Sequence, residues 1–229
     1  PSQSSAASDV YKRQILDTRD SSLEILDWIC EGFSENIEVI NYGILPSGSM
    51  PVLLETFGHN LGIIISASHN PSEYNGIKLI DENGSKLQDE IEIEIEANIE
   101  NISLPSAHTS HKESEKGFKV YFEFLNQILD FDLTNFDLLI DSANGSAYKI
   151  IDELLKDNDS KFKMIANEPN GENINLASGA THTENLIKNL KKGEIGAAFD
   201  GDADRLIMVD ENGITCLSLI HISEPTRPC

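Results

Sequence analysis

Apolar positions along the chain follow two spacings, one typical of helices and one typical of strands. Between residues 21 and 33 apolar side chains recur at helical intervals, which predicts an amphipathic helix ending near Gly32. Further helices are predicted over residues 51–57, 118–129 and 147–155. Short apolar runs predict strands at residues 37–40, 61–65, 77–80 and 136–140. Because strands and helices alternate, the pattern favours an α/β fold in which helices are layered on sheets.

One segment, residues 91–96, carries both patterns. Its isoleucines alternate with glutamates, as they would along a half-buried strand. However, Ile91, Ile95 and Ile99 also lie on one face of a helix. We therefore interpret this segment as a helix.

Two further features bear on how the chain is divided. The polar segment Ser103–Glu115 predicts a loop or linker between two units, with His108 and His111 as solvent-exposed linker residues. The tetrapeptide Asp-Glu-Asn-Gly occurs twice, at Asp81–Gly84 and at Asp210–Gly213, each time after an apolar strand. Both copies predict turns. An internal duplication would explain the pair, and chance recurrence of so short a motif remains the alternative.

Composition and charge limit the partners of this protein. The 229 residues, 39% of them hydrophobic, suit one or two globular domains. A formal net charge of −22 argues against nucleic-acid or anionic-membrane surfaces, which require clustered Lys and Arg. The distant Cys30, Cys216 and Cys229 indicate neither a disulfide framework nor a zinc site. No apolar run approaches the roughly 18 to 20 residues of a membrane helix, and no secretory signal is recognisable, so we expect a cytoplasmic protein.

The two ends of the chain do not resemble evolved protein. Ser4–Gln14 and Leu217–Arg227 back-translate into a pair of transposase sequencing adapters. The codons for Leu217–Ile222 are the reverse complement of those for Asp9–Gln14, a relation that unrelated termini would hardly share. We therefore interpret residues 1–14 and 217–229 as non-native tails and exclude them from fold reasoning. The remaining chain is predicted to form two domains, residues 15–115 and 116–216.

The first candidate for chemistry is the segment Ser66–Pro71, immediately after the predicted strand 61–65. Loops beyond the carboxyl ends of strands are where open α/β sheets bind ligands. The hydroxyl of Ser68, beside His69 and near Lys78, has the chemistry to carry or attack a phosphoryl group. An ordinary serine-rich turn is the alternative that these residues alone leave open.

The second candidate is Asp200–Arg205, which places Asp200, Asp202 and Asp204 at alternate positions in a loop between two apolar strands. Converging carboxylates about 4 Å apart would repel by roughly 4 kcal/mol per pair at an effective dielectric constant near 20. A bound cation would remove this cost, and hard oxygen ligands favour Mg²⁺. Carboxylates that splay apart in a solvated turn are the alternative. Another loop, Asp141–Ser146, predicts a strand-to-helix turn capped by Ser146.

Taken together, these motifs resemble the α-D-phosphohexomutase superfamily and, within it, the bacterial phosphoglucosamine mutases. The Ser-His-Asn-Pro element at Ser68–Pro71 and the Asp-Gly-Asp-x-Asp-Arg element at Asp200–Arg205 occur in the family's order. The segments that add to the resemblance are Asp17–Arg19, Asn75–Lys78, Ser142–Tyr148 and Glu168–His182. The family's glycine-rich N-terminal segment, its later sugar-recognition loop and its C-terminal phosphate-binding loop are not found in this sequence.

The resemblance implies a fold and a set of roles. It implies repeated α/β domains with mixed sheets covered by helices, of which the first is incomplete, the second nearly complete and the later ones absent. Ser68 would carry the phosphate and, with Asp200, Asp202 and Asp204, would hold one Mg²⁺. Further catalytic roles would fall to His69 and Lys78, for proton transfer or charge balance, and to Arg205, which would steady phosphate charge.

The implied reaction interconverts glucosamine 6-phosphate and glucosamine 1-phosphate through a phosphoserine and a sugar bisphosphate, which also acts as activator. Such an isomerase would feed UDP-N-acetylglucosamine and cell-wall synthesis. Its partner would be a small sugar phosphate rather than nucleic acid or a membrane. Assembly into a homo-oligomer is compatible with the resemblance. The alternatives are a phosphomannomutase or phosphoglucomutase of the same superfamily, or a sugar-phosphate or metal-binding module without turnover. Because substrate positioning supplies much of catalysis, we expect the chain by itself to show little or no mutase turnover.

Overall fold

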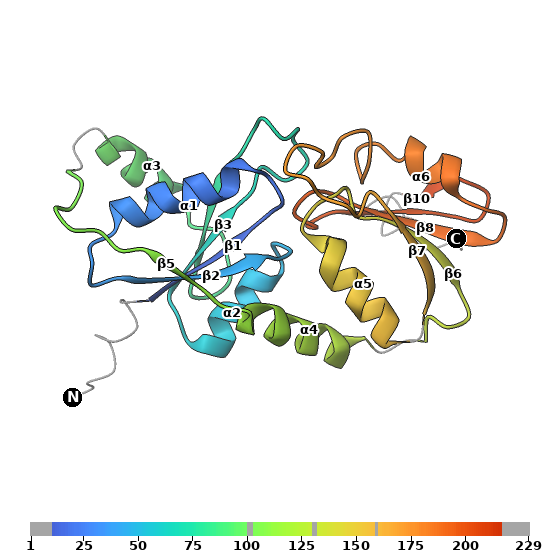
Figure 1. Ribbon diagram of the computed structural model, residues 1–229, viewed down its shortest axis with the longest axis horizontal. Coiled ribbons are helices and arrows are strands. Elements are labelled where there is room, and N and C mark those ends of the chain that lie inside the picture. The colour runs from blue at the N-terminus through green and yellow to red at the C-terminus, as the bar shows by residue number, and fades with distance from the viewer. Residues whose placement is uncertain (1–10, 100–102, 130–131, 159, 217–229) are drawn as a thin grey trace.

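A computed structural model of the protein describes residues 11–99, 103–129, 132–158 and 160–216. Over these ranges the chain forms two five-stranded sheets that lie beside one another and carry helices on their faces (Figure 1). Within the described ranges no helix combines the length and the apolar character needed to cross a membrane. The predicted α/β class with mixed, helix-covered sheets is therefore confirmed.

The first sheet is mixed. Its unit consists of β1 (Tyr11–Leu16), α1 (Ser21–Gly32), β2 (Glu38–Ile44), α2 (Ser49–Phe57), β3 (Leu61–Ile65), β4 (Ile77–Asp81), α3 (Asp89–Asn98) and β5 (His111–Glu113). The strand order is β4-β3-β1-β2-β5, in which only β4 runs antiparallel to its neighbour. Helices α1 and α2 cover opposite faces (Figure 1).

The second sheet is also mixed. Its unit consists of α4 (Lys116–Ile128), β6 (Asp137–Asp141), α5 (Ala147–Asp157), β7 (Lys161–Ile165), α6 (Glu184–Asn189), β8 (Glu194–Phe199), β9 (Leu206–Val209) and β10 (Thr215–Cys216). The order is β10-β9-β8-β6-β7, with β6, β7 and β8 parallel and β9 antiparallel to β8. One face packs against α5 through Leu155, and the other packs against α6 through Leu186.

The two sheets share one topology. The strands β4-β3-β1-β2 and β9-β8-β6-β7 have the same order, the same directions and helices at the same places in the chain. The two Asp-Glu-Asn-Gly turns follow the equivalent strands β4 and β9. In each turn the aspartate Oδ1 accepts two backbone amides, from Asn83 and Ser85 in one and from Asn212 and Ile214 in the other. This shared geometry supports the internal duplication.

A buried cluster joins the two units. It contains Ile15, Met50 and Ile64 from the first unit, Tyr121 from α4 and Ile150 from α5. Helix α4 packs against both α2 and α5, so the predicted division between residues 115 and 116 falls at the start of a helix that contacts both units. The loops at the carboxyl ends of the central strands are therefore held next to each other by a common core.

Most elements follow the predictions closely. Helix α1 and strand β3 have the predicted bounds, and the ambiguous segment 91–96 lies in helix α3, as interpreted. The predicted loop at Ser103–Glu115 is wrong over His111–Glu113, which forms the edge strand β5 beside β2. An edge strand is held by backbone hydrogen bonds and leaves its side chains in solvent, so it requires no apolar pattern. His111 is only half-exposed, because it lies beside Asp27 and Glu113.

Two other expectations need correction. Exclusion of residues 1–14 from the fold is wrong for Tyr11–Gln14, which form the start of the central strand β1, with Gln14 fully buried. Strand β1 pairs with β2 and β3 through backbone hydrogen bonds, which do not depend on the origin of the side chains. Residues 1–10 and 217–229 lie outside the described ranges. Ser146 precedes α5 as expected, but its side chain makes no capping hydrogen bond; its amide donates to Gly201 O instead.

Candidate functional site

The loop between β3 and β4 holds Ser68 in an unusual conformation. Its φ is +51°, in the left-handed region that residues other than glycine seldom occupy. Its amide donates to Ser66 Oγ at 2.9 Å, and the amide of Asn70 donates to Ala67 O at 3.1 Å. These local bonds close the turn and direct the Ser68 hydroxyl out of the loop.

The backbone carbonyls of this loop are held from outside it. Arg19 follows β1, is buried, and donates through Nη2 to Ser68 O at 3.0 Å and to Asn70 O at 2.8 Å. Its Nε lies 3.1 Å from Asp17 Oδ2, which compensates the buried guanidinium charge. Asn175, from the second unit, donates to the same two carbonyl oxygens at 2.8 and 3.0 Å.

The loop between β8 and β9 occupies the equivalent place in the second unit. Asp200 and Asp202 are buried, whereas Asp204 is exposed. The amide of Arg205 donates to Asp200 Oδ1 at 3.2 Å. A Cβ added at Gly201 would lie 2.6 Å from Ser68 O, so glycine is required there for the two loops to approach each other this closely.

The tertiary structure brings the two loops together. Ser68 Oγ donates to Asp200 Oδ2 at 2.7 Å, although the two residues lie 132 positions apart. Lys78, on β4, places Nζ 2.7 Å from Asp202 Oδ2 and 3.5 Å from Asp204 Oδ2. Ser47 Oγ also donates to Asp202 Oδ2, at 2.6 Å. Two hydroxyl groups, an ammonium group and three carboxylates thus form one site at the junction of the units.

Burial and neighbouring charges shift the proton affinities of this site. Burial, with repulsion from Asp202 and Asp204, raises the pKa of Asp200 to about 6. Burial also opposes ionisation of Asp202, but hydrogen bonds from Lys78 and Ser47 outweigh it and lower the pKa of Asp202. Burial disfavours the charge on Lys78 as well, but the adjacent carboxylates raise its pKa. The Lys78 ammonium is therefore charged at neutral pH and partly neutralises the acidic cluster.

The acidic cluster fits a small divalent cation. One carboxylate oxygen from each of Asp200, Asp202 and Asp204 lies within 4.8 Å of the other two. Among the described residues Asp202 Oδ1 is buried and has no hydrogen-bond partner, so it retains an unused lone pair within the cluster. All these donors are hard oxygens, which Mg²⁺ prefers over softer ligands.

His69 and Arg205 are less firmly engaged. His69 is half-buried beside Ser68, and within the part of the chain that the structure describes its buried Nδ1 has no hydrogen-bond partner. The Arg205 side chain is exposed, with Nε 3.8 Å from Asp204 Oδ1. Its guanidinium group therefore lies at the rim of the site and is free to contact a phosphate.

Three residues of the site were not assigned a role from the sequence. Arg19 lies in the Asp17–Arg19 segment, whose position after a strand could have indicated the site. Ser47 and Asn175 lie in loops whose composition resembles that of ordinary turns. Their partners are 155 and 107 positions away along the chain, so no local pattern pointed to them.

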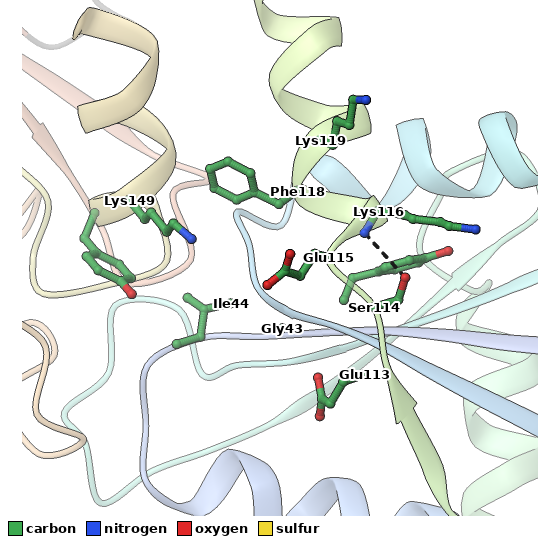
Figure 2. Close-up of a pocket in the computed structure, with 11 residues that line it drawn as sticks. Gly43, Ile44, Glu113, Ser114, Glu115, Lys116, Phe118, Lys119 and Lys149 are labelled. Atoms are coloured by element: carbon green, nitrogen blue, oxygen red, sulfur yellow. Dashed lines mark hydrogen bonds between the residues drawn. The ribbon is translucent and has the colours of Figure 1, made fainter.

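A separate hollow of about 690 Å³ lies where β2, the start of α4 and the start of α5 meet (Figure 2). Figure 2 shows Lys149 extending from α5 toward the Phe118 ring, and its Nζ lies 4.7 Å from the ring centroid. The full lining comprises Tyr42, Gly43, Ile44, Glu113, Ser114, Glu115, Lys116, Phe118, Lys119, Tyr148 and Lys149. None of the residues predicted for phosphoryl or metal chemistry lines this hollow.

Comparison with known proteins identifies both units. Residues 16–106 match the model of phosphoglucomutase/phosphomannomutase α/β/α domain I, and residues 119–213 match that of domain II. The chain is 39% identical over 208 residues to phosphoglucosamine mutase of Clostridium kluyveri and 41% identical over 207 residues to that of Clostridium tetani. Each match covers 86% of this chain and 46% of the relative, so the chain spans about half the length of these proteins.

Solved structures agree on the fold. A putative phosphomannomutase from Thermus thermophilus superposes with a TM-score of 0.77 at 20% identity, covering 90% of this chain and 49% of that one. An N-acetylphosphoglucosamine mutase from Aspergillus fumigatus, solved with GlcNAc-6P and magnesium, superposes with a TM-score of 0.53 at 19% identity and covers 75% and 47%. With both domain models matched in order over most of its length, the chain belongs to the phosphoglucomutase/phosphomannomutase family.

Proposed function

We propose that this chain supplies the phosphoryl-transfer half of a phosphoglucosamine mutase, which interconverts glucosamine 6-phosphate and glucosamine 1-phosphate. The observation that carries the proposal is the 2.7 Å hydrogen bond from Ser68 Oγ to Asp200 Oδ2, inside a cluster of three carboxylates. The choice of sugar is supported by the curated relatives, which are phosphoglucosamine mutases. The proposal includes a cytoplasmic location, as expected from the sequence.

Ser68 Oγ carries the phosphoryl group in this reaction. The bond between phosphorus and Ser68 Oγ breaks as a sugar hydroxyl oxygen bonds to phosphorus, which yields a sugar bisphosphate and a free serine. One proton passes overall from the sugar hydroxyl to Ser68 Oγ, and we assign its transfer to His69, whose ring adjoins the serine. The bisphosphate then returns its other phosphate to Ser68, so the cycle neither gains nor loses phosphate.

Charge on the moving phosphoryl group is neutralised by the surrounding cations. Lys78 holds its ammonium at the acidic cluster, and Arg205 is placed to reach phosphate oxygens from the rim. Asp200, Asp202 and Asp204, together with Ser68, would hold one Mg²⁺, which when bound supplies Lewis-acid neutralisation of phosphate charge. The A. fumigatus enzyme, whose structure contains a sugar phosphate and magnesium, supports this substrate class and metal.

The first test measures phosphate transfer to the serine. The 229-residue chain is incubated with a hexose 1,6-bisphosphate and Mg²⁺, and the modified residue is located by mass spectrometry. We expect one phosphoryl group on Ser68, none in Ser68→Ala, and unchanged modification in Ser85→Ala, an exposed serine in the turn after β4. Phosphorylation elsewhere, or none at all, would contradict the assignment of Ser68.

The second test addresses the sugar. The complete reading frame, recovered from the source DNA, is assayed with glucosamine 6-phosphate, Mg²⁺ and a bisphosphate primer, beside its Ser68→Ala variant. We expect turnover that the substitution abolishes. Activity restricted to mannose or glucose phosphates would replace the proposed specificity with that of a phosphomannomutase or phosphoglucomutase. Sugar-phosphate binding without turnover would indicate a non-catalytic module.

A further inference from the structure

The carbonyl oxygen of Ser68 lies at a point where both domains converge. Arg19 Nη2 approaches it from domain I at 3.0 Å, and Asn175 Nδ2 approaches it from domain II at 2.8 Å. Figure 1 shows the loop that contains Asn175, between β7 and α6, reaching toward the loop between β3 and β4. The serine loop is therefore held partly by a residue that belongs to the neighbouring domain.

The side chain of Asn175 is suited to this contact in a way that few residues are. Its amide nitrogen carries two hydrogens, and it donates one bond to Ser68 O and another to Asn70 O, at 2.8 and 3.0 Å. Aspartate has no hydrogen to donate, and serine has only one. Two carbonyl acceptors also settle the orientation of the amide, because its oxygen could not occupy the same position.

Asn175 is itself held rigidly. It is 6% exposed, and its backbone amide donates to Ala143 O, in the turn after β6, at 2.8 Å. Its φ is +57°, a left-handed conformation that asparagine tolerates better than most residues. Gly201 lies against the same contact, since a Cβ there would come within 2.8 Å of Asn175 Nδ2. Three segments of domain II thus converge behind the Ser68 carbonyl.

We propose that Asn175 is a positioning residue that holds Ser68 in its left-handed conformation and so aims Oγ at the acidic cluster. Ser68 pays for this conformation with strain that must be offset by contacts outside its own turn. Because one of those contacts comes from domain II, the phosphate-carrying serine is correctly oriented only when the two domains are docked. The catalytic part of this inference rests on the proposed function, whereas the structural part does not.

The first test measures backbone protection of the serine loop by hydrogen exchange in the 229-residue chain. Asn175→Gly removes the side chain without straining the left-handed backbone, and Asn175→Asp keeps the shape but removes both donors. We expect faster exchange over residues 66–71 in both variants. Asn173→Ala is the matched control, because its side-chain amide donates to Glu168 O and accepts from the backbone amide of Asn170, both within its own loop. Unchanged exchange over residues 66–71 in a folded Asn175→Asp variant would overturn the proposal.

The second test measures how fast Ser68 takes phosphate from a hexose bisphosphate. A misplacement of the reacting oxygen by about 1 Å lowers the rate on the order of a hundredfold. We therefore expect Asn175→Gly and Asn175→Asp to reduce the maximal rate of Ser68 phosphorylation. The bisphosphate concentration at half-maximal rate should change little. A change confined to that concentration would refute a positioning role. If Ser68 takes no phosphate in the chain without substitutions, the proposed function fails. The exchange measurement alone then decides the role of Asn175.

Discussion

The two domains place different chemistry at the same point of one topology. In domain I the loop between β3 and β4 carries Ser68 and leads to Lys78. Strand β3 lies beside the central strand β1, and β4 pairs with β3 in the antiparallel direction. In domain II the equivalent loop, β8 to β9, carries Asp200 and Asp202. One copy thus supplies the hydroxyl and the ammonium, and the other supplies the carboxylates. When two domains of the same topology dock with these two loops adjacent, the loops combine into one site that neither forms alone.

A second difference lies at the ends of the central strands. Asp17 directly follows β1, and Asp141 ends β6. Each Oδ1 accepts the amide two residues later, from Arg19 at 3.1 Å and from Ala143 at 2.9 Å. Burial raises the pKa of both carboxyl groups, but within the described ranges only Asp17 of the two forms an ion pair, with the Arg19 guanidinium. The aspartate of this turn therefore has an ion-pair partner in domain I but only backbone hydrogen bonds in domain II. In domain I the partner, Arg19, also holds the serine loop.

This contrast gives the largest expected effect. Asp17→Asn would leave the Arg19 charge buried without its ion pair, which costs about 3–5 kcal/mol in comparable buried pairs. Asp141→Asn keeps an acceptor for Ala143 and leaves no buried cation without an ion pair, so we expect a smaller loss of stability than for Asp17→Asn. Urea denaturation of both variants at neutral pH measures the difference. Equal destabilisation would mean that the two turns are energetically alike and that the ion pair contributes little.

The contact between the two loops gives an intermediate effect. Gly201→Ala would place a Cβ 2.6 Å from Ser68 O and 2.8 Å from Asn175 Nδ2, so the loops must separate. Overpacking of this kind costs about 1–3 kcal/mol. Gly32→Ala is the control, because no atom lies within 4 Å of a Cβ added there, at the last residue of α1. Thermal denaturation should show a lower Tm for Gly201→Ala only, and an unchanged Tm would indicate that the domains do not press together here.

The paired Asp-Glu-Asn-Gly turns give the smallest effect. Backbone hydrogen bonds, from Ser85 to Asp81 and from Ile214 to Asp210, lower the pKa of each carboxyl group below its ordinary value. Each ionised carboxylate therefore stabilises the fold above the unfolded-state pKa, and this contribution is lost as pH falls through the lower folded-state pKa. Asp81→Asn and Asp210→Asn should each flatten the fall in stability between about pH 5 and about pH 3, and by similar amounts. A marked difference between the variants would break the equivalence of the turns.

Much of the fold could be predicted because its signals are local. The apolar spacing of α1 and the continuous apolar run of β3 each lie within one element, and both were located correctly. Strand β5 was missed because its polar residues pair through the backbone alone. The start of β1 was missed because Tyr11–Gln14 were excluded on account of their coding sequence, whereas strand pairing depends on backbone and position.

The site was predictable to the extent that it is encoded in short segments. The Ser68 loop and the Asp200–Asp204 loop could be recognised because their chemistry is concentrated within a few residues. The contributions of Arg19 and Asn175 could not, since each is an ordinary polar residue until its partner across the fold is known. The catalytic and metal-binding roles of the recognised residues remain predictions that the phosphorylation and assay experiments will decide.

The sequence by itself determined the elements, the two turns and the spacing of the carboxylates, because each depends on residues only a few positions apart. Glycine at Gly84 and Gly213, for example, permits the positive φ of each turn regardless of the rest of the fold. Only the tertiary structure decided that Ser68 Oγ lies 2.7 Å from Asp200 and that Asn175 holds the serine loop. Those contacts depend on strand order and on the packing of two domains, and both are set by interactions summed over the whole buried core rather than by any local pattern.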